Sequence, residues 1–132
     1  MLNKQLLFPP CIDNQYKRRK IAFWAFALIT LLTLIRSMIH IFSADGGAQS
    51  IATIPLDKYS PGASPTINLL FAFWGLSQLL MGFIFIVVSL RYRSLVPLMY
   101  ILIFLEYGGR LLIGHWKPVA TTATPPGEIG NY

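Results

Sequence analysis

The sequence predicts an all-α membrane protein with three transmembrane helices. Hydrophobic residues make up 55% of the 132 residues, charged residues make up 12%, and the mean hydropathy is +0.57. Soluble domains average roughly 45–50% apolar and about 25% charged residues. In addition, three apolar stretches are each long enough to cross a hydrocarbon core of about 30 Å, which takes about 20 helical residues.

The predicted spans are 21–42, 67–90 and 95–114, joined into one helical domain that covers residues 21–114. The first span is too long for a secretory leader and ends without a small-residue cleavage pattern, so we expect a retained anchor. Asp45-Gly46-Gly47 predicts a turn at the start of the connecting loop 43–66. Residues 115–132 have no apolar period and are expected to form a flexible tail.

The distribution of lysine and arginine predicts the orientation of the helices. Loop 43–66 and the tail hold one lysine each, whereas seven basic residues precede the first span or lie between the second and third spans: Lys4, Lys17, Arg18, Arg19, Lys20, Arg91 and Arg93. Basic loops stay in the cytoplasm. We therefore expect residues 1–20 to be a basic cytoplasmic segment, and loop 43–66 and the C-terminus to lie outside.

The net charge of +6 is then mainly a topology signal, and the lipid bilayer is the partner that it implies. Binding of nucleic acid is not expected, because a basic run directly before a transmembrane helix is the ordinary juxtamembrane pattern.

One face of the second span carries small and polar residues. Gly75, Gln78, Gly82 and Ser89 share this face at 100° per residue. Small residues let helix backbones approach closely in lipid. We expect this face to pack against another helix.

Ionisable residues occur inside two of the spans. Arg36 and His40 lie one turn apart in the first span, and Glu106 and Arg110 lie one turn apart in the third. A charge at the bilayer centre costs about 2.5–3.5 kcal/mol on insertion scales, so such groups face a partner, a cavity or a ligand. Counted at about 1.5 Å per residue, both arginines lie roughly 22 Å from the cytoplasmic side, and Gln78 reaches nearly the same level. The sequence predicts a single polar layer.

Two interpretations of this layer are open. In the structural one, Glu106 pairs with one arginine, the other arginine extends to the headgroups, and the layer holds the helices together. In the functional one, the surplus cation and His40 hold an anionic or polar ligand such as a lipid phosphate, a quinone oxygen or a small carboxylate. The candidate ligand-binding or ion-pair residues are Arg36, His40, Gln78, Glu106 and Arg110.

The sequence shows no nucleophile motif, no glycine-rich phosphate loop and no metal-binding histidine spacing. No catalytic residue, metal or cofactor is assigned, and an enzyme is the least favoured class. The thin three-helix bundle favours an accessory or interaction subunit that assembles with itself or with a partner membrane protein. The alternative is a small transporter or binding protein for an anionic or quinone-like ligand.

Several short runs resemble a family of uncharacterised small bacterial multi-pass membrane proteins. The resemblance covers most of the chain from about residue 36 onward. It implies a location in the bacterial inner membrane, and it brings no activity, cofactor or ligand with it. The matching residues are Arg36, His40, Asp45-Gly46-Gly47-Ala48, Phe73-Trp74-Gly75, Gln78-Leu79, Arg91-Tyr92-Arg93, Val96-Pro97-Leu98-Met99, Glu106, Arg110, Lys117-Pro118 and Thr124-Pro125-Pro126-Gly127.

The orientation is tested by reporter fusions. Alkaline phosphatase fused after Tyr132 should be active, because the charge pattern places that end outside the cytoplasm. The same enzyme fused after Tyr92 should be inactive. A fluorescent protein that matures only in the cytoplasm should give the reverse pattern, and fluorescence after Tyr132 would contradict three spans.

Overall fold

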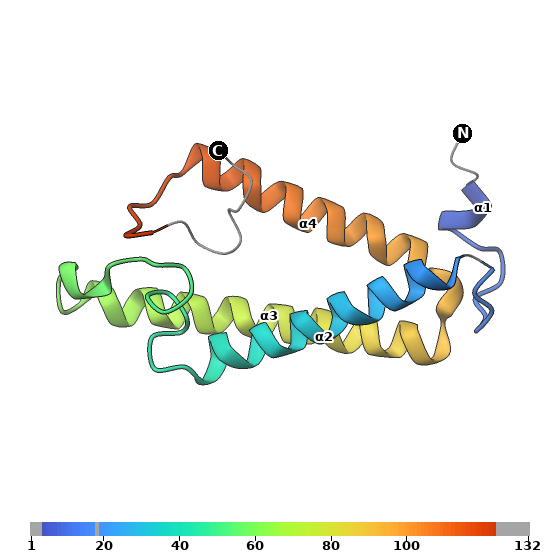
Figure 1. The fold of residues 1–132 in the computed structure, drawn as a ribbon, viewed down its shortest axis with the longest axis horizontal. Helices are drawn as coiled ribbons and strands as arrows, with labels where there is room; N and C mark the ends of the chain where they lie inside the picture. The colour runs from blue at the N-terminus through green and yellow to red at the C-terminus, as the bar shows by residue number, and fades with distance from the viewer. Residues whose placement is uncertain (1–3, 18, 124–132) are drawn as a thin grey trace.

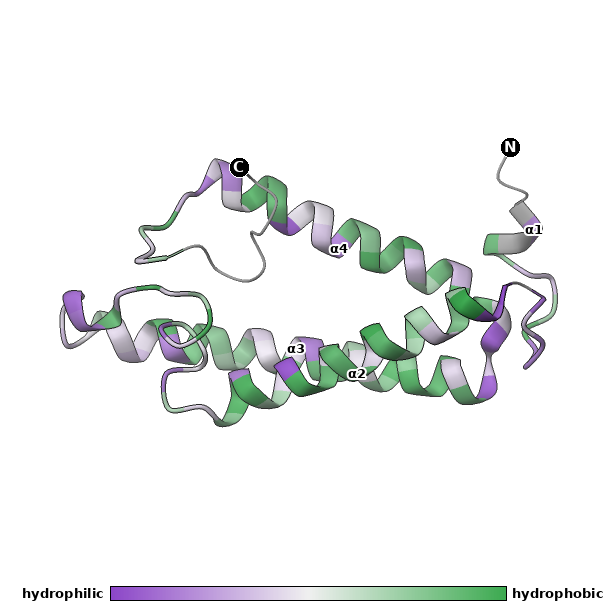
Figure 2. Cartoon of the chain, viewed as in Figure 1, coloured by the Kyte–Doolittle hydropathy of each residue, from purple (hydrophilic) through white to green (hydrophobic). Residues whose placement is uncertain are grey.

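The computed structural model describes residues 4–17 and 19–123, and this part of the chain is helical without strands. Three helices are long and apolar enough to cross a membrane, which confirms the predicted helical class (Figures 1 and 2). The elements, in order, are α1 (Lys4–Leu7), α2 (Lys20–Phe42), the short 3-10 helix η1 (Leu56–Lys58), α3 (Ala63–Arg91), a second 3-10 helix η2 (Arg93–Leu95) and α4 (Val96–Trp116).

Helices α2 and α3 form an antiparallel pair along most of their length (Figure 1). The glycine face of α3 makes this possible. A Cβ added at Gly75 would lie 2.6 Å from the Cβ of His40 and 3.1 Å from the carbonyl oxygen of Ser37. At Gly82 it would lie 2.7 Å from Cδ2 of Leu34. The predicted close packing through Gly75, Gln78 and Gly82 is confirmed, and all three residues are buried.

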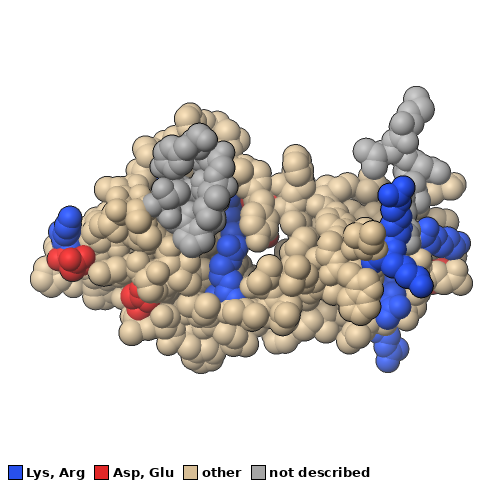
Figure 3. All heavy atoms as spheres, in the orientation of Figure 1, with Lys and Arg blue, Asp and Glu red and all other residues tan. Residues whose placement is uncertain are grey.

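Helix α4 packs on this pair mainly near its own N-terminus and then diverges from it (Figure 1). There the Tyr100 hydroxyl donates a hydrogen bond to the carbonyl oxygen of Ala22 at 2.6 Å. The core of this end consists of Phe26, Phe85, Val88, Val96 and Met99. We call it the basic end, because lysine and arginine side chains gather there beside the N-terminal segment and η2 (Figure 3).

The opposite end carries the loop between α2 and α3, and we call it the loop end. Ala48, Ile54 and Leu56 are buried there against Ile67 and Phe71 of α3. The segment after α4 returns to this loop, where the Thr122 N–H donates to the carbonyl oxygen of Thr53 at 2.9 Å and the Thr53 hydroxyl donates to that of Ala123 at 2.6 Å.

Some helix bounds differ from the sequence expectation. Helix α3 begins at Ala63, before the expected start at residue 67, because Pro65 falls in its first turn, where proline leaves no hydrogen bond unmade. Helix α4 continues to Trp116, so the expected tail begins as helix. Arg18 and the run Thr124-Pro125-Pro126-Gly127 lie outside the described residues.

The fit between α2 and α3 is tested at two glycines. Gly75→Ala should lower the melting temperature in detergent, because the added methyl group meets the Cβ of His40 and a backbone oxygen. Overpacking of this kind costs about 1–3 kcal/mol. Gly82→Ala should cost less, because the end of the flexible Leu34 side chain can move. Gly62→Ala, with open space around it, is the control. Equal melting of all three variants would contradict the close approach.

Candidate functional site

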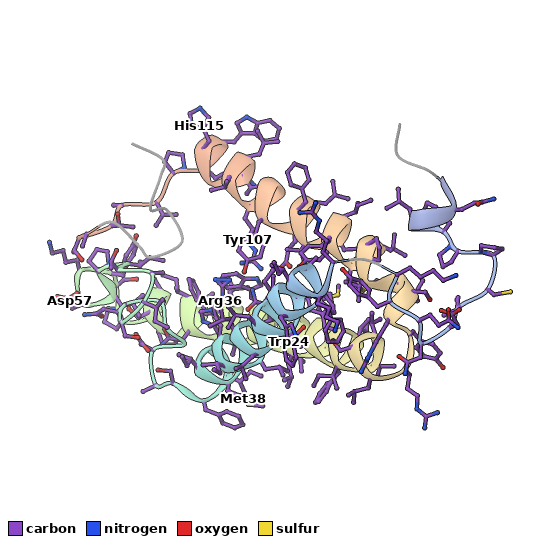
Figure 4. All side chains as sticks on the ribbon, turned by 45° about the vertical axis from the view of Figure 1, so that its right-hand side comes forward. Trp24, Arg36, Met38, Asp57, Tyr107 and His115 are labelled. Carbon is purple, nitrogen blue, oxygen red and sulfur yellow. The ribbon has the colours of Figure 1, made fainter. Side chains whose placement is uncertain are left out.

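The five candidate residues lie in the half of the bundle nearer the loop end, where α4 has left the α2–α3 pair. Two aromatic residues, Trp74 of α3 and Tyr107 of α4, lie among them. We call the set the polar layer, and it consists of Arg36, His40, Trp74, Gln78, Glu106, Tyr107 and Arg110. Arg36 and Tyr107 extend toward each other from α2 and α4 (Figure 4).

Arg110 is the centre of the layer. It forms an ion pair with Glu106, one turn earlier on α4. With the Gln78 amide turned so that its oxygen faces Arg110, that oxygen accepts from Nη2 at 2.6 Å and from Nη1 at 3.3 Å. The guanidinium carbon also lies 4.7 Å from the centre of the Trp74 ring and 5.0 Å from that of Tyr107. The charge of Arg110 is thus compensated, and the residue connects α4 to α3.

Arg36 has a different environment. Its Nη2 donates to the Tyr107 hydroxyl at 3.2 Å, and its guanidinium carbon lies 5.8 Å from the centre of that ring. Among the described residues, no carboxylate forms an ion pair with it. The layer therefore combines two guanidinium groups with one carboxylate, and the uncompensated positive charge belongs to Arg36.

His40 is buried, with 2% of its surface exposed. Its Nδ1 lies 2.7 Å from the carbonyl oxygen of Gly46. A carbonyl only accepts, so Nδ1 carries a proton. Nε2 is also buried and has no hydrogen-bond partner among the described residues. The ring packs on Trp74 at a centroid distance of 4.7 Å. His40 thus connects the loop to the polar layer. Among the described residues, it forms no hydrogen bond with Glu106 or with an arginine.

The loop keeps its position over His40 through Asp45 and two glycines. Gly46 and Gly47 have φ of 59° and 76°, a backbone region that favours glycine. The predicted turn is confirmed here. The Asp45 carboxylate accepts from the backbone N–H groups of Gly47 at 2.9 Å and Ser50 at 2.6 Å. Burial acts to raise the pKa of Asp45, but hydrogen bonds from Ser50, Gly47 and Ser43 outweigh it and hold the pKa well below its usual range. The carboxylate is therefore ionised at neutral pH.

The sequence interpretation did not place Trp74 and Tyr107 in the polar layer, because tryptophan and tyrosine in membrane helices are commonly found at the membrane surfaces. Trp74 lies one turn before Gln78, and Tyr107 directly follows Glu106. Aromatic faces attract guanidinium groups. The short sequence distance of Trp74 from Gln78 and of Tyr107 from Glu106 could therefore have indicated that both rings lie in the layer.

The layer offers hydrogen bonding and ion pairing. Among residues 4–17 and 19–123, no group of three or more histidine, cysteine, aspartate or glutamate side chains could hold a metal ion. The arrangement can hold helices together, and it can present a cation to a ligand.

The role of Glu106 is tested by removing its charge. Glu106→Gln should lower the folded yield, because it leaves the half-buried Arg110 without its counter-ion at the expected membrane depth. An unpaired charge at the bilayer centre costs about 2.5–3.5 kcal/mol on insertion scales. The double variant Glu106→Gln with Arg110→Met should recover much of the yield.

Asp57→Asn is the matched control for this test, because it removes one carboxylate from the exposed surface of η1. It should leave the folded yield unchanged. A Glu106→Gln variant that melts like the wild type would contradict a compensating role for Glu106.

No family model, curated protein or solved structure matches this chain. The resemblance to small bacterial multi-pass proteins therefore stays a prediction, and the layer itself carries the functional proposal.

Proposed function

We propose that this protein is a small, non-catalytic interaction subunit that assembles with a second copy of itself through α4. The observation that carries the proposal is an ion pair, at the expected membrane depth, on a half of α4 that the described residues cover only in part. The Glu106 side chain is 38% exposed and that of Arg110 is 27% exposed. Charged groups at membrane depth are costly in contact with lipid and normally face protein.

The same half of α4 has room for another backbone. A Cβ added at Gly108, Gly109 or Gly114 would meet no atom of the described residues within 4 Å. Exposed glycines allow a neighbouring transmembrane helix to approach closely. The helices in the described part of the chain do not fill this space, which supports the approach of a helix from outside the chain.

Charge complementarity favours a second copy as the occupant. Each α4 carries a carboxylate and a guanidinium group one turn apart, and a two-fold axis brings the same surface of both copies together. Glu106 uses Oε1 for Arg110, while a carboxylate has about four acceptor positions. The remaining positions fit Arg110 of the other copy.

The proposal also covers cellular location and orientation in the membrane. We infer a bacterial inner membrane with the basic end in the cytoplasm, supported by the gathering of lysine and arginine at that end (Figure 3) and by the resemblance described above. The alternative function, a binding protein for an anionic ligand, is favoured by one separate observation, the uncompensated charge of Arg36.

Cysteine cross-linking tests the interface. In a Cys11→Ser background, which removes the free exposed thiol, Gly109→Cys should form a disulfide-linked dimer in membranes, because this position faces the second copy. Leu80→Cys is the matched control, since Leu80 is exposed on α3 away from the Gly75–Gly82 face. It should stay monomeric.

Native mass spectrometry in mild detergent gives the second measurement. The wild type should appear as a dimer, and Gly109→Leu should shift it to the monomer. A monomeric wild type without cross-linking would overturn self-assembly. A complex with a different membrane protein would keep the interaction function but replace the second copy as its partner.

A further inference from the structure

A pocket of about 250 Å³ lies between α2, α4 and the loop, on the side where α4 diverges. A hollow is visible in the middle of the molecule beside an isolated group of basic side-chain atoms (Figure 3). Ligand pockets commonly measure roughly 300–1,000 Å³, so this one suits part of a ligand rather than a whole large one. Its lining residues are Leu32, Ile35, Arg36, Ile39, Ile51 and Tyr107.

Two polar groups of the described residues converge in this pocket, and its other described lining residues are apolar. Arg36 is the charged one, and no acidic side chain of residues 4–17 and 19–123 lines the pocket. The Tyr107 hydroxyl oxygen accepts from Arg36, so its own hydrogen stays available for a ligand. A guanidinium group and a phenolic O–H side by side form a donor pair for an oxyanion, and hydrogen bonds to charged oxygen are roughly twice as strong as neutral ones. A neutral quinone would leave the positive charge uncompensated.

The apolar lining residues of α2 form a wall that runs along the helix axis. Leu32, Ile35 and Ile39 follow the helical spacing of one face of α2, and all three are exposed residues. Arg36 lies six residues before the end of α2 at Phe42, which corresponds to about 9 Å along the helix. Ile51 of the loop also lines the pocket. A ligand with its charged group at Arg36 would therefore extend an alkyl chain past Leu32 toward the basic end, as a lipid does in its leaflet.

We propose that this pocket binds one anionic phospholipid of the leaflet at the loop end, with Arg36 and Tyr107 holding its phosphodiester and the α2 wall holding an acyl chain. One uncompensated positive charge matches the single negative charge of such a headgroup. All lining residues belong to one copy of the chain, so the site does not depend on the α4 interface proposed above.

Lipid retention measured by native mass spectrometry tests the site. The full chain is extracted in mild detergent and titrated with phosphatidylglycerol, which is anionic, or with phosphatidylcholine, which carries no net charge. The wild type should retain one phosphatidylglycerol per chain with at least about tenfold preference, the factor expected from a charge-assisted contact. Equal retention of both lipids would overturn the proposal.

Three variants place the lipid in the pocket. Arg36→Gln should remove the preference, Tyr107→Phe should reduce it several-fold, and Ile35→Trp should abolish retention by filling the pocket while leaving the charge in place. Arg91→Gln is the matched control, since it removes one exposed positive charge at the basic end. It should retain phosphatidylglycerol like the wild type, and loss of retention there would overturn a specific site.

Folding and ligand identity are controlled separately. Arg36→Gln should melt within a few degrees of the wild type when lipid is absent, because it loses the exposed contact with Tyr107 and no ion pair among the described residues. A marked loss of stability would instead make Arg36 structural and overturn the proposal. Competition with oleate and with inorganic phosphate distinguishes the sources of the anion. Displacement of phosphatidylglycerol by either at equal concentration would overturn the assignment to a phospholipid.

Discussion

The close approach of α2 and α3 at Gly75 determines the geometry of the half of the molecule at the loop end. Because no side chain separates the helices there, the Cβ of His40 lies directly over the α3 backbone, and its ring packs between Trp74 and the loop. Trp74 in turn presents a ring face to Arg110 of α4. The close approach at Gly75 thus positions the loop, the stacked rings of His40 and Trp74, and the Arg110 guanidinium group that connects α4 to α3.

The two arginines of the polar layer are chemically identical but have different surroundings. Arg110 has a carboxylate, an amide oxygen and two ring faces around it. Arg36 has a hydroxyl and one ring. The difference arises because Glu106 lies one turn from Arg110 on the same helix, so the pair forms without any loop closure, whereas pairing with Arg36 requires α4 to approach α2. The divergence of α4 keeps these two helices apart and leaves the charge of Arg36 uncompensated.

Much of the fold could be predicted from the sequence, because helix length in a membrane is set by apolar length and helix faces follow from 100° per residue. The three apolar helices and the Gly75–Gly82 face are confirmed on this basis. The depth and helical angle of each residue, counted from the sequence, also predicted that the five candidate residues lie at one level. These counts could not predict which arginine Glu106 contacts, since that depends on the spacing between helices. The start of α3 at Ala63 was not predicted either, because a proline such as Pro65 is compatible both with a break before a helix and with the first turn of a helix.

Hydrogen bonds between Thr122 and Thr53 connect the segment after α4 to the loop between α2 and α3. The N-terminal end of α4 is held in the core around Val96 and Met99, and Arg110 connects its middle to Gln78 of α3. Beyond that core, the described contacts of α4 with the α2–α3 pair are few and polar. The spacing between α4 and the pair beside Arg36 therefore depends on a small number of side-chain contacts, whereas the basic end depends on a packed apolar core.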